Sequence, residues 1–166
     1  MLAVLENRLG RCGLTLHPDQ TRWLPCGRPP QEQHSGKGLA TFDFLGFTCS
    51  WARSRQGRWG MWCKTRRASL RRAKTAIYDW CRRHRHQPME AQHAALGQRL
   101  RGHYNSFGVS GNFRSVLRVV AATKRAWYTW LCRRSQRKRL NWKRCVDLLR
   151  QFPLPRPRIV VRIWGI

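Results

Sequence analysis

Seven acidic side chains could hold a catalytic metal ion or act as general acid and base in this sequence. They are widely spaced and never adjacent along the chain: Glu6, Asp19, Glu32, Asp43, Asp79, Glu90 and Asp147. Polymerases and nucleases need carboxylates that hold two metal ions roughly 4 Å apart. The six histidines form no HxxxH pattern, and there is no GxxxxGK(S/T) loop or evident Ser–His–acid combination. This chemistry predicts a binding module with no catalytic residues and no metal site.

Cysteine is the other residue type that could bind a metal or form cross-links. The seven cysteines are scattered, without CxxC spacing: Cys12, Cys26, Cys49, Cys63, Cys81, Cys132 and Cys145. A structural zinc site needs clustered ligands, so we expect mostly buried, reduced thiols, as in cytoplasmic proteins. The first ten residues lack the long apolar run of a signal peptide. A cytoplasmic protein without a bound cofactor is therefore expected.

Positive charge is the strongest signal in the composition. The 166 residues carry 34 Lys and Arg against 7 Asp and Glu, a net charge of +27. Such a charge resists compaction unless a polyanion neutralises it, and phosphate backbones are the obvious partner. No long apolar segment accompanies the charge, which disfavours a membrane. The excess is mainly Arg, whose bidentate contacts and stacking suit RNA or DNA.

The elements that would position these cations begin with a small N-terminal part. Leu2, Leu5 and Leu9 share one face of a helix expected over residues 1–12, and Gly13 would end it. A short strand is expected at residues 15–16.

Residues 25–40, rich in Pro, Gly and Ser, predict a surface loop. Large apolar residues then alternate over 42–48 and predict a strand. A second strand is expected over 58–63, joined to the first by a turn at 54–57 in a hairpin.

From Thr65 onward the apolar period changes to steps of three and four. We expect helices over 66–86, from Pro88 towards Tyr104, from Asn112 to near Arg134, and from Asn141 to Phe152. The tail rich in Pro and Arg should be extended. The fold class is therefore α+β and predominantly α-helical, with a small α/β segment and a β-hairpin before a basic bundle of three or four helices.

One face of the helix expected over 66–86 is basic, and almost no acid balances it. A solvated surface usually mixes both signs, so we interpret this face as a nucleic-acid contact. Its basic residues are Arg66, Arg67, Arg71, Arg72, Lys74, Arg82 and Arg83.

Five stretches together resemble, in order, the C-terminal part of bacterial group II intron reverse transcriptase/maturases. RLGRCGLTLHPDQTR (8–22) and FDFLGF (42–47) are similar to late palm motifs. LRGHYNSFGVSGN (100–112), WLCRRSQRKRLNW (130–142) and FPLPRPRI (152–159) resemble the thumb, or maturase domain X. The resemblance covers nearly the whole chain.

This resemblance implies a division into a palm remnant (1–50), a connecting hairpin (51–64), a thumb/maturase helical domain (65–152) and an extended tail (153–166). In the family, domain X binds the intron RNA, assists its folding for splicing, and holds the template–primer duplex. The chain departs from the family because the YxDD polymerase motif, which needs Mg²⁺, and an HNH endonuclease domain are absent, and Gln20 replaces the usual Lys. An RNA-binding maturase fragment that is not itself an enzyme is expected.

The resemblance also implies further RNA-contacting residues. In the glycine-punctuated motif these are Arg101, Tyr104, Asn105 and Asn112. Basic residues of the following helix add Arg114, Lys124 and Arg125. The run after that helix contributes Arg133, Arg134, Gln136, Arg137, Lys138 and Arg139.

Three other interpretations remain open. The chain could be one piece of a working RNA-directed DNA polymerase whose catalytic half is encoded upstream. It could be a basic ribosomal-type RNA-binding protein without intron history, or a decayed product with no present role. If it is a palm remnant, Leu2, Leu5, Leu9, Phe42 and Phe44 should be poorly covered, and residues 1–50 less stable than the helices.

Overall fold

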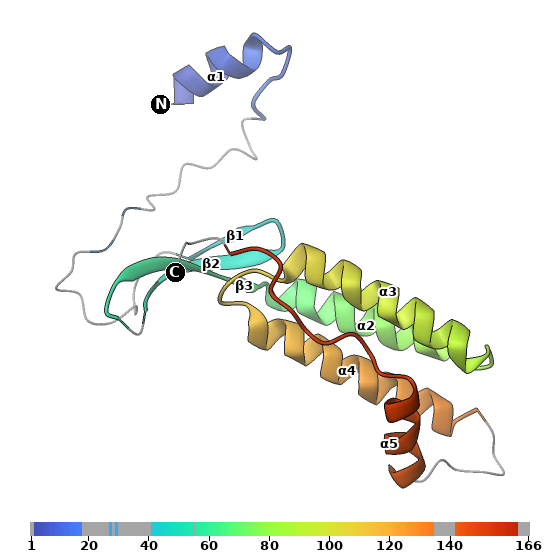
Figure 1. The fold of residues 1–166 in the computed structure, drawn as a ribbon. Helices are drawn as coiled ribbons and strands as arrows, with labels where there is room; N and C mark the ends of the chain where they lie inside the picture. Colours follow the sequence, from blue (N-terminus) through green and yellow to red (C-terminus); the bar gives the residue numbers. More distant parts are fainter. Residues whose placement is uncertain are drawn as a thin grey trace.

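Three long helices form the centre of the molecule, and a small sheet lies at one end of them (Figure 1). The computed structural model describes residues 2–17, 27, 29, 41–54, 56–134 and 142–162. The elements in chain order are α1 (Leu2–Gly10), β1 (Thr41–Phe44), β2 (Phe47–Arg53), β3 (Trp59–Thr65), α2 (Arg67–Arg83), α3 (Met89–Phe107), α4 (Phe113–Cys132) and α5 (Trp142–Gln151). The chain is mixed α and β with helix predominating, as predicted.

The sheet is antiparallel with strand order β1-β2-β3. The expected hairpin is present between β2 and β3, where Cys49 pairs with Cys63 and the turn contains Ser54 and Gly57. This hairpin spans residues 47–65, more than the predicted 51–64.

The single strand predicted over 42–48 is wrong, because it is broken into β1 and β2 by a two-residue turn. Leu45 (φ 47°) and Gly46 (φ 82°) both have positive φ, the backbone of a type I′ hairpin turn. A third strand is thereby added to the sheet. No strand forms at Thr15 and Leu16, a second correction, since residues 14–17 have no regular structure.

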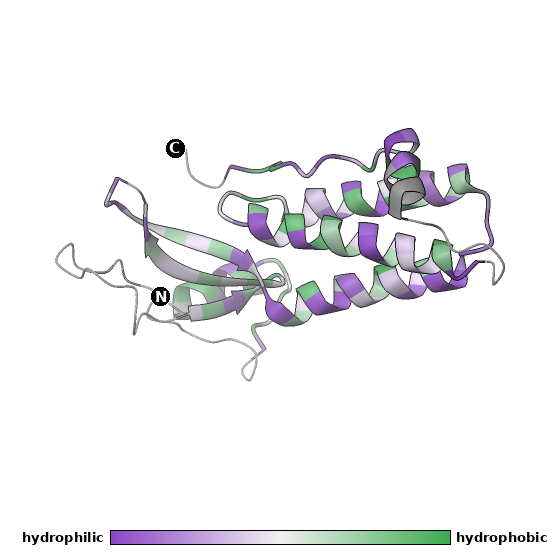
Figure 2. Cartoon of the chain, turned by 90° about the horizontal axis from the view of Figure 1, so that it is seen from below, coloured by the Kyte–Doolittle hydropathy of each residue, from purple (hydrophilic) through white to green (hydrophobic). Residues whose placement is uncertain are grey.

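The central helices follow the apolar spacing read from the sequence. On α2 the buried side chains are Ile77, Trp80 and Cys81, and on α4 Val116, Val119 and Trp127 are almost inaccessible. Figure 2 shows hydrophilic residues recurring along the helices and alternating with apolar ones, as expected for amphipathic helices. The three helices bury their apolar faces against one another.

A polar group is buried within this core and links the helices. The amide of Gln92 on α3 accepts a hydrogen bond from Trp127 Nε1 on α4 (2.9 Å). Its nitrogen donates to the carbonyls of Arg85 (3.3 Å) and Gln87 (2.7 Å) in the α2–α3 connection. Gln92 thus satisfies its own polar atoms and fixes α2, α3 and α4 relative to one another.

The glycine-punctuated motif is mostly helical. Leu100–Phe107 belong to α3, so Gly102 does not contribute to the turn that was predicted from its glycines. The turn occupies residues 108–112. At Gly108 a Cβ atom would collide with the carbonyl oxygens of Tyr104 and Arg158. Only glycine allows the C-terminal segment to approach α3 this closely.

That C-terminal segment is extended, as predicted, and runs back along the bundle towards the sheet (Figure 1). Tyr104 Oη donates to the Pro155 carbonyl (2.8 Å), and His93 Nε2 lies 3.0 Å from the Pro153 carbonyl oxygen. A parallel bridge joins Val109 to Val161. We call residues 153–162 the C-terminal strap.

α1 agrees with the helix predicted over 1–12, and Gly13 with positive φ follows it. Val4 and Leu5 of α1 are exposed, as is Phe44 of β1, while Leu9 and Phe42 are half-buried. Partial coverage of the N-terminal apolar residues is therefore observed at the positions that the structure describes. None of the described helices is both long enough and apolar enough to span a lipid bilayer.

Candidate nucleic-acid interface

Two adjoining hollows between α2 and α4 form a groove. Its end near the sheet has a volume of about 480 Å³ and is lined by Lys64, Thr65, Arg67, Leu70, Arg71, Lys74, Ser115 and Arg118. Its distal end has about 540 Å³ and is lined by Lys74, Thr75, Tyr78, Arg118, Ala121, Ala122, Arg125, Ala126 and Thr129. Lys74 and Arg118 line both parts, so we treat them as one α2–α4 groove.

Helical spacing explains why these side chains gather. Arg67, Arg71 and Lys74 follow one another at four and three residues along α2, and therefore share one face of that helix. Arg118 and Arg125, seven residues apart, share a face of α4. The two faces meet because the adjacent apolar stripes of both helices are buried in the same core.

The groove is strongly electropositive. Six cationic side chains line it: Lys64, Arg67, Arg71, Lys74, Arg118 and Arg125. Among the residues that the structure describes, no Asp or Glu lines either part. An anion in this groove would therefore meet cations from both walls without a competing carboxylate.

The direction of the helices adds to this field at one end. Residues from the first turns of both helices, Arg67 of α2 and Ser115 of α4, line the part near the sheet, so the helices run parallel (Figure 1). Each helix places a partial positive charge of about half a unit at its N-terminus. Both partial charges thus lie at the end that also carries Lys64.

A buried hydrogen-bond cluster fixes that end of the groove. Asn112, 1% exposed, accepts a hydrogen bond from the Thr65 backbone N–H at 2.8 Å. Its Nδ2 donates to Thr65 Oγ1 and to the Phe107 carbonyl, both at 2.7 Å. The cluster connects the end of β3 with the turn before α4, and therefore sets the distance between Lys64 and the α4 wall.

Four of the predicted RNA-contacting residues lie in the groove: Arg67, Arg71, Lys74 and Arg125. Other predicted residues are exposed but line neither part of it: Arg72, Arg82, Arg83, Arg101, Asn105, Arg114, Lys124, Arg133 and Arg134. Arg83 Nε donates to the Asp79 carbonyl (3.4 Å), and Arg134 to the His86 carbonyl (3.1 Å). Gln136, Arg137, Lys138 and Arg139 lie outside the described residues.

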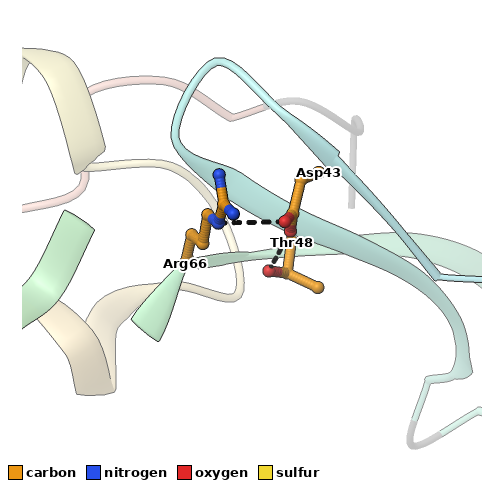
Figure 3. Close-up of polar contacts among 3 residues, drawn as sticks. All are labelled: Asp43, Thr48 and Arg66. Carbon is orange, nitrogen blue, oxygen red and sulfur yellow. Dashed lines mark hydrogen bonds and ion pairs between the residues drawn. The ribbon is translucent and has the colours of Figure 1, made fainter. Parts of the chain in front are cut away.

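Three of the predicted RNA-contacting residues make contacts within the protein. Arg66 forms an ion pair with Asp43 (Nε–Oδ2 2.9 Å), whose other oxygen accepts from Thr48 Oγ1 at 2.6 Å (Figure 3). The pair joins the β1–β2 hairpin to the start of α2. Tyr104 and Asn112 are each 1% exposed and hydrogen-bonded within the protein. All three hold the fold together, and neither Tyr104 nor Asn112 is accessible to an RNA.

The position of Asn112 before α4 had suggested that its side chain caps this helix. The structure shows no such cap hydrogen bond. The Asn112 amide is used for Thr65 and Phe107 instead.

Sequence reasoning missed Lys64, Arg118 and Tyr78 as groove residues. Arg118 could have been found, since it lies four residues after Arg114 and seven before Arg125, on one helical face. Lys64 had no such signal, because its place depends on where β3 ends against α4.

Two other titratable side chains near α3 are not part of this interface. Burial raises the pKa of the Cys81 thiol to about 11, so it is protonated and unreactive in the core. Burial lowers the pKa of His103, whose ring stacks on Phe107 at 4.8 Å. His103 is therefore neutral at pH 7. Among the residues that the structure describes, no group of three or more His, Cys, Asp or Glu forms a metal-binding cluster.

Comparisons of this chain with protein-family models, with curated proteins and with solved structures find no match.

Proposed function

We propose that this protein binds RNA through the α2–α4 groove, as the RNA-binding fragment of a group II intron maturase that assists intron folding and splicing. The observation that carries the RNA-binding part is the groove itself. It presents six cations from β3, α2 and α4 and, among the described residues, no acid. The resemblance of five ordered motifs to the maturase family supports intron RNA as the partner.

Phosphate is the ligand that fits this groove best. Four of the six cations are Arg, which can make bidentate contacts to phosphate oxygens. The hydroxyl groups of Thr65 and Ser115 lie among them near the sheet, although each is nearly buried. Successive groove cations on α4 are seven residues apart, about 10 Å at a rise of 1.5 Å per residue.

The proposed mechanism is physical and involves no covalent step. Cations in the groove neutralise phosphates, release their counterions and lower the repulsion between RNA segments that must pack together. In this proposal the residues of this sequence have no catalytic activity of their own, and any reverse transcription would require the YxDD polymerase half of the family.

Binding measured against salt tests the phosphate contacts. If all six cations engage phosphates, log K should fall with log salt concentration with a slope of about −4 to −5. The double variant Arg71→Gln/Arg118→Gln should bind at least about tenfold more weakly at low salt, with a shallower slope.

The matched control is Arg72→Gln/Lys124→Gln, which removes the same number of charges from exposed positions outside the groove. Equal losses in the two double variants would mean that only net charge matters, and would overturn the groove as the binding site. A second comparison, between a group II intron RNA and random RNA of equal length at moderate salt, tests the maturase assignment. Equal affinity for both would refute that assignment while leaving RNA binding intact.

A further inference from the structure

The two ends of the α2–α4 groove differ in chemistry. Near the sheet the lining is cationic and hydroxylic, with Leu70 as its one apolar side chain among the described residues. The distal end is lined by an aromatic ring, Tyr78, and by the small side chains of Ala121, Ala122 and Ala126. Its volume of about 540 Å³ lies within the range of small-ligand pockets. The small lining residues leave room that a phosphate alone does not need.

Tyr78 is exposed yet held in place. The residue is 39% exposed. The ring makes an edge-on contact with Trp130 of α4, with centroids 5.4 Å apart and planes inclined by 65°. The guanidinium groups of Arg85 and Arg133 lie 5.8 Å and 5.1 Å from the centroid of the same Trp130 ring. Tyr78 is therefore supported by a packed cluster, which lowers the entropy lost when another ring stacks on it.

We infer that the distal end of the groove binds an unpaired nucleobase, stacked on Tyr78, while Lys74, Arg118 and Arg125 hold the adjoining phosphates. This inference rests on the proposed RNA binding and specifies its ligand as a junction between paired and unpaired nucleotides. A base inside a duplex already stacks on both neighbours, so it has no free face for Tyr78. An unpaired base has one, and base–aromatic stacking is favourable for every base type.

The test uses one RNA duplex in two forms, blunt and with two unpaired nucleotides at one end. The wild-type protein should bind the extended form about tenfold more tightly. Tyr78→Leu, which keeps an apolar side chain but no ring, should bind the blunt and the extended form with equal affinity and so lose this preference. Tyr78→Phe keeps the ring and should keep the preference. Circular dichroism of each variant reports whether the helices are intact.

A fluorescent adenine analogue, 2-aminopurine, placed at the unpaired position provides a readout on the wild-type protein itself. Stacking on Tyr78 should quench its emission on binding, and the same analogue inside the duplex should show little change. If wild type binds neither RNA, the proposed function fails. If it binds both forms equally without quenching, RNA binding stands and the inference about Tyr78 is overturned.

Discussion

The helical bundle and the sheet differ in how completely their side chains are covered. In the bundle, Leu96, Leu100, Val116 and Val119 are 0% exposed. In the sheet, Phe44 is 60% and Leu45 77% exposed, although Cys49 and Trp59 are buried. Buried apolar area is the main source of stability, so the bundle supplies most of it. The sheet is joined to the bundle by the Asn112–Thr65 hydrogen bonds, by the Phe47–Phe107 ring contact and by the Arg66–Asp43 pair.

The difference in coverage also concerns RNA binding, because the walls of the groove, α2 and α4, belong to the more stable region. Lys64 and Thr65 are the exceptions, since β3 supplies them. Changes in the bundle should therefore remove both stability and binding, while changes in the sheet should affect only the end of the groove near it.

The largest effect is expected for Trp127→Ala. Trp127 is 1% exposed and donates to Gln92, so the change opens a cavity and leaves a buried amide oxygen unpaired. We expect a loss of about 3–5 kcal/mol in the free energy of unfolding, measured by urea denaturation. Leu117→Ala, at an exposed position of the same helix, should change it by less than about 0.5 kcal/mol. Similar values for the two would contradict the assignment of the core.

The next largest effect is a gain in the stability of the sheet from a disulfide. Cys49 and Cys63 are directly opposite each other in β2 and β3. The backbone bonds from Ser54 N–H to the Arg58 carbonyl and from Arg66 N–H to the Gly46 carbonyl place this pair at a non-hydrogen-bonded position. Cα atoms there are roughly 4.5 Å apart, within the range for disulfides.

Oxidised glutathione should therefore convert the two thiols to a disulfide, releasing two molecules of reduced glutathione. Closing a loop of about 15 residues should stabilise the hairpin by up to about 3 kcal/mol. Mass spectrometry of a digest checks the link. A link from Cys63 to a cysteine other than Cys49 would show that the strand register is different.

Asn112→Ala should break the connection between sheet and bundle. The Thr65 N–H would lose its partner in a buried site, at a cost of about 1–3 kcal/mol. Backbone amides of β3 should exchange with deuterium faster, while those in the middle of α4 change little. Asn105→Ala, at an exposed position of α3, is the control. Unchanged exchange in β3 would mean that the sheet is held by other contacts.

Alkaline pH should weaken the bundle through Tyr104. Burial raises the pKa of Tyr104 from 10.0 to about 12. Because the folded state favours the protonated phenol, its stabilising effect is complete below pH 10 and is lost as pH rises through 12. Unfolding followed between pH 9 and 12 should show this decline. Tyr104→Phe, which cannot ionise, should decline less steeply, and an identical pH profile would assign the effect to other groups, such as Cys81.

The smallest effect is expected for Asp43→Asn. The carboxylate and guanidinium of the Asp43–Arg66 pair are 43% and 53% exposed, so solvent screens their attraction. We expect a loss of about 0.2–1 kcal/mol that decreases further at high salt. A loss above 2 kcal/mol would show that the pair is a main support of the sheet.

The sequence predicted those elements whose signal is local. Helical periodicity was sufficient for α2 and α4, since their apolar residues recur at three and four positions over several turns. The β1–β2 hairpin was missed because Leu-Gly is not a typical pair for its turn, and a leucine with positive φ is unusual. The sequence indicates the glycine but not the backbone conformation of its neighbour.

The candidate site was predicted only in part, because burial depends on distant partners. Tyr104 and Asn112 have residue types common at interfaces, but their hydrogen-bond partners, Pro155 and Thr65, are 51 and 47 residues away. The groove likewise requires two helices that are separated by α3 in the chain. A basic helix face can be read from spacing, whereas the second wall that makes it a groove cannot.

The C-terminal strap has a consequence for the order of folding. Its contacts with α3 join residues 51 and 60 positions apart, and such distant contacts form late because loop closure costs entropy. During synthesis α2, α3 and α4 are complete before residues 153–161 leave the ribosome. In that interval the Tyr104 hydroxyl lacks the Pro155 carbonyl, and the space beside Gly108 is empty. We therefore expect a nascent bundle with one open side, which the strap closes after α2, α3 and α4 have formed.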